Sequence, residues 1–393
     1  MLQDGAPTAS RGVTFWVAVA IAFILVAGGI TYLKVKAHGY FILSPGQAPV
    51  VTSEAACRPV GGGSFSLPGG RPCVQLVVPA GRAHTTDGTI MMVDVFEDRA
   101  NPWQYLIKKV PLLNRLEKDS VLVNAKEIVS GSASQLDCQN SEEAYQAATA
   151  APVAALRRLG YPVKEVDLGT QIATVYPGTP AARFGLQCGD VITGVDGKAV
   201  HTRDDLFAAL RGLPAGTVVR VRLQRGVDGP AAVRNIVTSV RLAPRPSPVA
   251  KQPPDPKQGY IGIDTGTYLK YDFPFPVSAQ VGSIGGPSDG LALALGFINT
   301  LSGGKLTGGL RVAATGTIDP DGTVGAIGGA AQKAVAVRRA GAQVFLVPAG
   351  DNYRDAKPEA GSMKVFPVAT LDQALADLRS LGGQIPPPVA TVK

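Results

Sequence analysis

Histidine is nearly absent from this sequence. The 393 residues include three histidines, His38, His84 and His201, and none of them follows Ser288. Ser288 lies in the glycine-flanked run Gly286-Pro287-Ser288-Asp289-Gly290, and a nucleophilic serine needs a neighbouring base. In the Gly-x-Ser-x-Gly elbow of α/β-hydrolases, an aspartate and then a histidine follow the serine. The missing histidine argues against that class and leaves Lys333 as the candidate base.

Aromatic and charged residues are also scarce, at 6% and 17% of the chain. The net charge is +8, but the lysines and arginines are scattered and form no long block. Proteins that bind nucleic acids combine basic patches with stacking aromatic side chains, so we expect no nucleic-acid partner. The positive charge instead favours weak attraction to an anionic membrane surface.

Cysteine usage and motif content argue against cofactors. The four cysteines are Cys57, Cys73, Cys138 and Cys188, and none is in a Cys-x-x-Cys pair or near a histidine. We therefore expect no metal site. The chain lacks the Gly-x-x-x-x-Gly-Lys-Ser/Thr phosphate loop, so we expect no cofactor and independence from ATP. Cys57 and Cys73 flank a glycine-rich loop and are candidates for a disulfide, worth about 3 kcal/mol.

Residues 13–33 form an uncharged run of 21 residues. A helix of this length spans about 30 Å, the thickness of a bilayer core. The run is too long for a cleaved signal peptide, and no clear Ala-x-Ala site follows it. We expect an uncleaved transmembrane helix at 13–33 after a short tail at 1–12. The lysines that follow favour a cytoplasmic body, whereas the cysteines favour the opposite side.

Composition divides the rest of the chain. Residues 40–160 combine β-rich segments with helices in a membrane-proximal region, and residues 163–242 form a second unit. The proline-rich stretch 243–259 predicts an extended, semi-rigid linker. Residues 260–383 open with strands and then alternate helices and strands, and residues 384–393 are expected to be a disordered tail. The predicted fold class is multidomain α+β.

The unit at 163–242 carries an ordered series of short motifs. Thr179-Pro180-Ala181-Ala182 predicts the start of a short helix. Gly185 and Gly189 permit tight turns, and Asp196-Gly197 is typical of a hairpin turn. This order resembles a bacterial-type PDZ domain of the kind attached to envelope proteases.

The PDZ resemblance implies that the unit binds the ends of extended peptides by adding a strand to a sheet edge. We expect the groove to lie between a strand and a helix. The residues expected to form it are Gly169, Thr170, Gln171, Ile172, Leu206 and Leu210. The alternative is that the apolar members, such as Leu206, only form the small core.

A second series of motifs surrounds Ser288. The serine precedes the apolar segment 291–301, and Thr315-Gly316, the turn Ile327-Gly328-Gly329 and Lys333 follow. This pattern resembles the α/β proteolytic domain of Lon proteases (S16-type peptidases), in particular a membrane-anchored, PDZ-containing branch of actinobacterial type. The resemblance implies that Ser288 is the nucleophile, Lys333 the base and Thr315 a hydrogen-bond partner of the lysine. It also implies a homo-oligomer, with a hexamer as one candidate, and a body outside the cytoplasmic membrane.

The neighbours of Lys333 support this role on physical grounds. They are small or apolar, as Ala334 and Val337 are, and loss of hydration among them favours the neutral amine. A neutral amine within hydrogen-bond reach can take the proton of a serine. The alternatives are a surface lysine at 333 and, at 288, a serine that only caps a helix.

One residue departs from the family pattern. Asp289 follows the serine, where the family usually has alanine, and an inward-facing carboxylate would oppose a developing oxyanion. We predict a membrane-anchored, ATP-independent serine endopeptidase that acts on proteins or peptides. The alternatives are a catalytically weak PDZ scaffold at the membrane and an α/β-hydrolase esterase.

Overall fold

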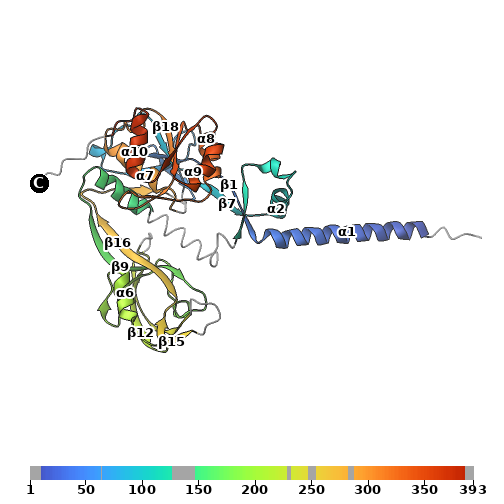
Figure 1. The fold of residues 1–393 in the computed structure, drawn as a ribbon, viewed down its shortest axis with the longest axis horizontal. Coiled ribbons are helices and arrows are strands. Elements are labelled where there is room, and N and C mark those ends of the chain that lie inside the picture. Colours follow the sequence, from blue (N-terminus) through green and yellow to red (C-terminus); the bar gives the residue numbers. More distant parts are fainter. Residues whose placement is uncertain are drawn as a thin grey trace, which may run out of the picture. The chain divides into compact units, whose positions relative to one another are not determined.

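The computed structural model describes residues 10–62, 64–125, 147–227, 232–246, 254–281 and 287–385. The chain divides into two compact units (Figure 1). The first unit consists of Met1–Pro45 and Val95–Ile128, and the second of Gly46–Asp94 and Val129–Lys393. Most of the two predicted tails, 1–12 and 384–393, lies outside the described residues.

The first unit joins a long helix to a small sheet. Helix α1 (Ser10–Ala37) leads into β1 (Tyr40–Pro45), which pairs antiparallel with both β7 (Val95–Arg99) and β8 (Val121–Asn124). Helix α2 (Pro102–Lys109) and the 3-10 helix η2 (Asn114–Glu117) lie between β7 and β8. Asn101 caps α2, because its side-chain oxygen accepts a hydrogen bond from the Gln104 N–H.

The predicted transmembrane helix at 13–33 is not supported. These residues lie within α1, so their helical conformation is as expected. In the part of the chain that the structure describes, however, no helix has both the length and the apolar character needed to span a bilayer.

The second unit contains a seven-stranded sheet in the order β17-β5-β2-β6-β18-β21-β22. Strands β6, β18, β21 and β22 are parallel neighbours, β2 is antiparallel to β6 and parallel to β5, and β17 is antiparallel to β5. The strands are β2 (Val50–Thr52), β5 (Cys73–Val77), β6 (Thr89–Met91), β17 (Ser278–Gln280), β18 (Arg311–Ala314), β21 (Val344–Pro348) and β22 (Lys364–Val368).

This sheet corrects the predicted domain boundaries. Strands β2, β5 and β6 come from the region 40–160, which we expected to be separate from the proteolytic domain at 260–383. Strand β6 instead pairs with β18 in the centre of the sheet. The expectation failed because hydrogen bonding between strands far apart in the chain leaves no local mark on the sequence of either strand.

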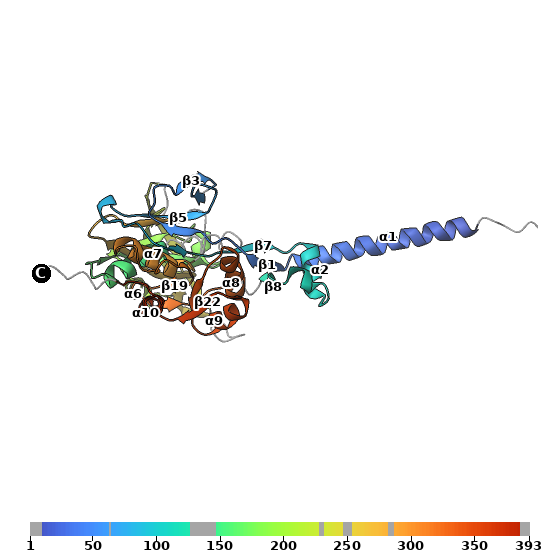
Figure 2. The ribbon, with the colours of Figure 1, turned by 90° about the horizontal axis from the view of Figure 1, so that it is seen from above.

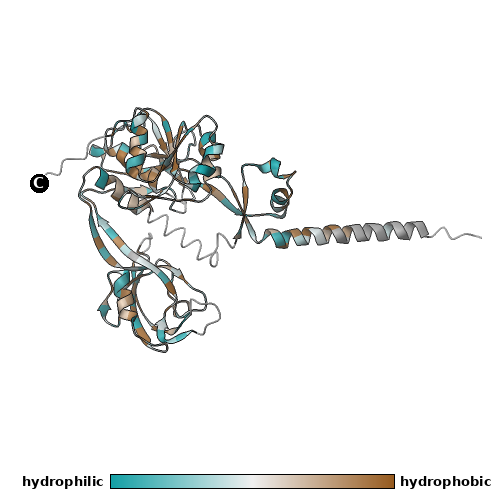
Figure 3. Cartoon of the chain, viewed as in Figure 1, coloured by the Kyte–Doolittle hydropathy of each residue, from teal (hydrophilic) through white to brown (hydrophobic). Residues whose placement is uncertain are grey.

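Helices cover both faces of the sheet. Side chains alternate between the faces along a strand, so Val312 and Ala314 of β18 enter one apolar cluster and Ala313 enters another. Helices α7 (Gly290–Leu301) and α10 (Leu371–Ser380) contribute to the first cluster, and α8 (Ala330–Arg339) and α9 (Asp351–Ala356) to the second. Every residue of α7 is buried, and its ribbon is largely apolar (Figure 3).

Shorter elements complete this part of the unit. They are the 3-10 helices η1 (Ala80–Arg82) and η3 (Lys357–Glu359), the hairpin of β19 (Thr317–Ile318) and β20 (Val324–Gly325), and a helix that includes residues 147–158. A further hairpin, β3 (Arg58–Gly61) with β4 (Ser64–Ser66), lies at the periphery of the unit (Figure 2).

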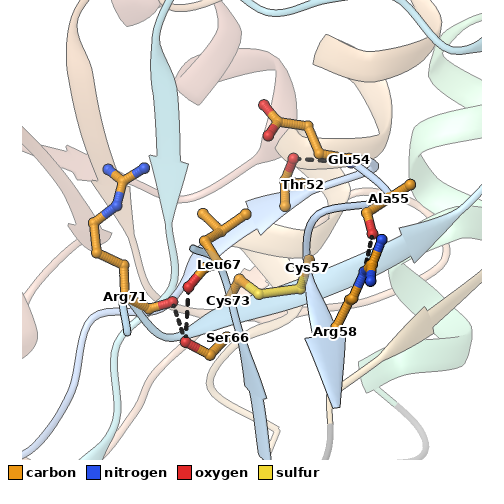
Figure 4. Close-up of a disulfide and its surroundings, with 9 residues drawn as sticks. All are labelled: Thr52, Glu54, Ala55, Cys57, Arg58, Ser66, Leu67, Arg71 and Cys73. Carbon is orange, nitrogen blue, oxygen red and sulfur yellow. Dashed lines mark hydrogen bonds between the residues drawn. A yellow bond between two sulfur atoms is a disulfide. The ribbon is translucent and has the colours of Figure 1, made fainter. Parts of the chain in front are cut away.

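A disulfide joins Cys57 to Cys73, as predicted (Figure 4). It links the residue before β3 to the first residue of β5, with 6.0 Å between the two Cα atoms. Both cysteines are buried and pack with Leu67 in a small apolar cluster. The bond therefore fastens the peripheral hairpin to the main sheet.

The PDZ-like part of the second unit is a sheet in the order β13-β12-β10-β9-β16, with β11 beside β10. Its apolar core includes Leu206 and Ile172. The elements are β9 (Lys164–Val175), α5 (Pro180–Arg183), β10 (Val191–Val195), β11 (Lys198–Ala199), α6 (Arg203–Leu210), β12 (Val218–Arg225), β13 (Arg234–Arg241) and β16 (Ile263–Asp272).

The predicted linker at 243–259 is not extended throughout. Its ends form an antiparallel pair of strands, β14 (Ala243–Arg245) and β15 (Asp255–Tyr260). The chain then continues into β16, which adds to the PDZ-like sheet outside β9. The sheet therefore extends beyond the predicted boundary at residue 242.

Candidate active site

Ser288 lies on the turn that begins α7, next to the end of β18. The residue is half-buried. Its carbonyl oxygen accepts hydrogen bonds from the Gly316 N–H at 2.8 Å and from the Thr315 hydroxyl at 3.1 Å. The Leu291 N–H donates to the Gly316 carbonyl at 3.1 Å. Together these bonds fix the serine turn against the residues that follow β18.

Gly316 is required for this close approach. Its φ angle is +147°, which L residues with a side chain rarely adopt. A Cβ atom on Gly316 would lie 2.7 Å from Cγ1 of Val324. A larger residue would therefore displace Val324 of β20 and strain the backbone that bonds to Ser288.

Lys333 reaches the same place from the opposite face of the sheet. Its side chain is carried by α8 and is 2% exposed. The Lys333 Nζ donates a hydrogen bond to the Thr315 Oγ1 at 3.2 Å. Thr315 thus accepts from Lys333 and donates to the carbonyl of Ser288, so the structure brings the three predicted residues together.

The start of α8 is held by a residue that the sequence did not reveal. The Asn352 Oδ1 accepts a hydrogen bond from the Ile327 N–H at 2.9 Å, and its Nδ2 donates to the Ile327 carbonyl at 2.7 Å. Gly329, at the cap of α8, has a left-handed backbone with φ of +67°. These features orient the helix that positions Lys333.

Burial changes the proton affinity of Lys333. Loss of hydration lowers the pKa of Lys333 to about 8, and the negative charges of Asp289 and Asp94 oppose that change. Among the described residues, the Lys333 amine makes no direct hydrogen bond to the Ser288 hydroxyl. Catalytic hydrogen bonds often tighten only when substrate binds, and Thr315 already links the two residues.

Two carboxylates share this site. Asp289, the unusual residue after the serine, is 4% exposed, and burial raises the pKa of Asp289 to about 7. Asp94 follows β6 and accepts a hydrogen bond from the Gln47 N–H. Burial also raises the pKa of Asp94, whereas that bond and the charge of Lys333 lower it.

The sequence analysis missed Asp94, because its place near the site depends on the pairing of two strands that are far apart in the chain. An acidic residue stands shortly after the apolar strand β6, and β6 runs parallel to β18. Parallel strands place their carboxyl ends at one edge of a sheet, where α/β proteins bind ligands. Asp94 and Thr315 both follow such ends.

The predicted PDZ groove is only partly correct. Gln171 pairs with Val191 of β10 on one side and with Gly266 of β16 on the other, and Thr170 is enclosed in the same way. Strand β9 therefore has no free edge near Gly169, Thr170, Gln171 and Ile172, and Ile172 is fully buried. The prediction placed the sheet edge at β9, because β16, which pairs with β9, follows the proline-rich stretch 243–259 in the sequence.

A pocket instead lies between α6 and the start of β16, the edge strand of this sheet. Leu206 and Leu210 line it, as predicted for the helix side. Phe207, Tyr260, Ile261 and Ile263 complete its apolar wall. Leu206 also belongs to the domain core, at 2% exposure, as the alternative interpretation of this leucine expected.

A second pocket adjoins the candidate nucleophile. It is lined by Pro287, which precedes Ser288, by Ile318 and Asp319, and by Tyr268 and Tyr271 of β16. This pocket offers room for part of a substrate chain beside the serine.

Two family models match this chain. The model of the PDZ domain matches residues 171–225, and the model of the Lon protease (S16) C-terminal proteolytic domain matches residues 257–378. Ser288, Thr315 and Lys333 all lie in the second range.

Similar curated proteins include proteases. The magnetosome formation protease MamE of Magnetospirillum gryphiswaldense is 31% identical over 133 residues, which cover 29% of this chain and 17% of MamE. Lon protease 1 of Sorangium cellulosum is 33% identical over 120 residues, 30% of this chain and 14% of that protein. Lon protease of Xanthomonas oryzae is 32% identical over 119 residues, with 29% and 14% covered. The matches thus span less than a fifth of each relative.

Solved PDZ domains are also similar to part of the chain. The PDZ domains of SdrC-like proteins from Listeria monocytogenes and Listeria innocua are 21% and 22% identical, each covering 25% of this chain, and 87% and 92% of their own, with a TM-score of 0.20. The family models and the curated relatives together show that the chain carries a PDZ domain and a Lon-type (S16) serine protease domain.

Proposed function

We propose that the protein is an ATP-independent serine endopeptidase with Ser288 as nucleophile and Lys333 as base. The observation that carries the proposal is the link from a buried lysine, 2% exposed, through the Thr315 hydroxyl to Ser288. A buried amine on this link is close to the serine and has a lowered pKa. Both properties suit a general base.

In the proposed reaction, the neutral Lys333 amine takes the proton from the Ser288 hydroxyl while Oγ attacks the carbonyl carbon of a peptide bond. The oxyanion that forms needs donors. Among the described residues, the N–H groups of Ser288 and Asp289 have no protein partner, whereas that of Leu291 is bonded to Gly316. We assign the oxyanion to the two free N–H groups.

Collapse of this intermediate breaks the C–N bond, and the Lys333 ammonium gives its proton to the leaving amine. The product is an ester between the substrate acyl group and Ser288 Oγ. Lys333, again neutral, then takes a proton from water, and the resulting hydroxide attacks the ester. Ser288 Oγ then leaves and takes the proton back from Lys333, which releases the acid and restores the enzyme.

The test is cleavage of β-casein, an extended substrate, by the full chain without ATP. We expect cleavage by the wild type and none by Ser288→Ala or Lys333→Ala, with all three proteins equally folded by circular dichroism. Activity in the wild type no greater than in both variants would favour the scaffold alternative, which Asp289 motivates. Ester hydrolysis that survives Lys333→Ala would favour the esterase.

We also propose that the PDZ domain selects peptide ends through the pocket between α6 and β16. Its apolar wall and its place beside an edge strand suit strand addition. Leu210→Glu should abolish binding of labelled C-terminal peptides in fluorescence polarisation. Val237→Glu is the matched control, because Val237 is 62% exposed on β13, the far edge of the sheet. Equal binding by both variants would reject this pocket.

The location and assembly remain proposals that rest on the sequence and on the family resemblance. We propose a membrane-attached protein with its body outside the cytoplasmic membrane, and a homo-oligomer, with a hexamer as one candidate. The disulfide Cys57–Cys73 is consistent with an oxidising compartment. Protease protection of the body in spheroplasts would reject the location, and a monomer by light scattering would reject the assembly.

A further inference from the structure

Two carboxylates that the proposed reaction does not use lie near Lys333. Asp289 follows Ser288, whose carbonyl is linked to the Lys333 amine through the Thr315 hydroxyl, and Asp94 follows β6, the strand beside β18. Both negative charges raise the pKa of Lys333, and the charge of Asp289 does so more strongly. Asp289 and Lys333 are 4% and 2% exposed, so water screens their interaction weakly.

The Asp289 carboxylate has few hydrogen-bond partners. It occupies the cap position of α7, but its side chain makes no capping hydrogen bond. Its Oδ1 is buried and has no hydrogen-bond partner among the described residues. The electrostatic partner that stabilises its charge most is therefore Lys333. Asp94 differs, because the Gln47 N–H already stabilises its carboxylate.

We propose that Asp289 is a positioning residue that restrains the base, because its carboxylate stabilises the ammonium form of Lys333 and so sets the pH range in which the dyad is active. The inference rests on the proposed serine–lysine function. A lysine held as an ammonium cannot take the serine proton. Asp289 thus limits activity near neutral pH, while Asp94 adds a smaller contribution of the same sign.

The sign follows from the charges. A carboxylate near Lys333 stabilises its ammonium form, so the Asp289 charge raises the pKa of Lys333 against the lowering caused by burial. Removal of the Asp289 charge should therefore lower the pKa of Lys333 by about one pH unit or more. The neutral share of the lysine near pH 7 would then rise.

The kinetic test measures kcat/KM between pH 6 and pH 10 for the full chain and its variants. In Asp289→Asn and Asp289→Ala, the acid limb should move to lower pH by about one unit or more. The ratio of activity at pH 7 to activity near pH 9.5 should rise about fivefold, as a shift of one pH unit gives. Asp289→Glu, which keeps the charge, should keep the wild-type midpoint, and Asp94→Asn should give a smaller shift in the same direction.

A second readout needs no catalysis. In Ser288→Ala protein labelled with 13C-lysine, NMR follows the titration of the Lys333 Cε signal, which is assigned by its loss in Lys333→Met. Adding Asp289→Asn should lower the titration midpoint by about one pH unit or more. Urea unfolding at pH 8 checks that each variant is folded before its titration is compared.

An unchanged lysine midpoint, or an acid limb of Asp289→Asn identical to that of the wild type, would overturn the inference. A shifted midpoint without peptidase activity in any variant would instead refute the serine–lysine function and leave the electrostatic coupling standing. The two failures are therefore distinguishable.

Discussion

Replacement of Thr315 by valine tests how the dyad is held together. Valine keeps the shape of threonine but cannot accept the hydrogen bond from Lys333 Nζ or donate to the Ser288 carbonyl. The carbonyl retains the bond from the Gly316 N–H, so the larger penalty falls on the buried amine. Leaving one buried donor without its partner costs about 1 to 3 kcal/mol. The free energy of unfolding should fall by about that amount.

The catalytic effect of Thr315→Val should exceed its effect on stability. The threonine hydroxyl is the group that holds the Lys333 amine near Ser288 by a hydrogen bond, and a misplacement of about 1 Å can reduce a rate 100-fold. We expect kcat to fall about 10- to 100-fold with a smaller change in KM. The assays are hydrolysis of a fluorogenic peptide and urea unfolding. Thr315→Ser keeps the hydroxyl and should remain near the wild type; equal activity of Thr315→Val and Thr315→Ser would refute the reasoning.

Three further predictions concern residues that support the fold. Asn352→Leu removes both hydrogen bonds to the turn before α8. The free energy of unfolding should therefore fall by about 1 to 3 kcal/mol, and kcat should also fall. An unchanged free energy in urea unfolding together with an unchanged kcat would contradict this role. Arg225→Met leaves the fully buried Asp190 carboxylate without its ion pair. Calorimetry should show a loss of stability of about 3 to 5 kcal/mol. The control Arg220→Met should show no such loss. Reduction of Cys57–Cys73, or the double change to serine, should cost about 3 kcal/mol, and a melting temperature insensitive to reductant would refute that estimate.

The residues of the candidate site could be predicted to different extents. Ser288, Thr315 and Lys333 stand in short motifs within one continuous stretch, and the structure brings them together. Asp94 lies 195 residues before Asp289 in the sequence. Its place beside Lys333 depends on the parallel pairing of β6 with β18, which no local pattern reveals.

The fold shows the same limit. The Cys57–Cys73 bridge closes a short loop, so the two cysteines could be recognised as candidates for a disulfide from their spacing. The PDZ edge was misjudged, because β16 pairs with β9 across the proline-rich stretch. The three strands that residues 50–91 give to the main sheet were missed for the same reason. Local motifs therefore located the candidate residues Ser288, Thr315 and Lys333, whereas long-range strand pairing decided the domain boundaries and the open edge of the PDZ-like sheet.

The central claim is that Lys333 activates Ser288 for covalent catalysis. The most direct measurement is mass-spectrometric mapping after treatment of the full chain with a fluorophosphonate. We predict a single adduct on the peptide that contains Ser288, formed by the wild type and greatly slowed in Lys333→Met. An adduct that forms at Ser288 equally fast without the lysine, or no adduct on that peptide at any pH up to 10, would contradict the account.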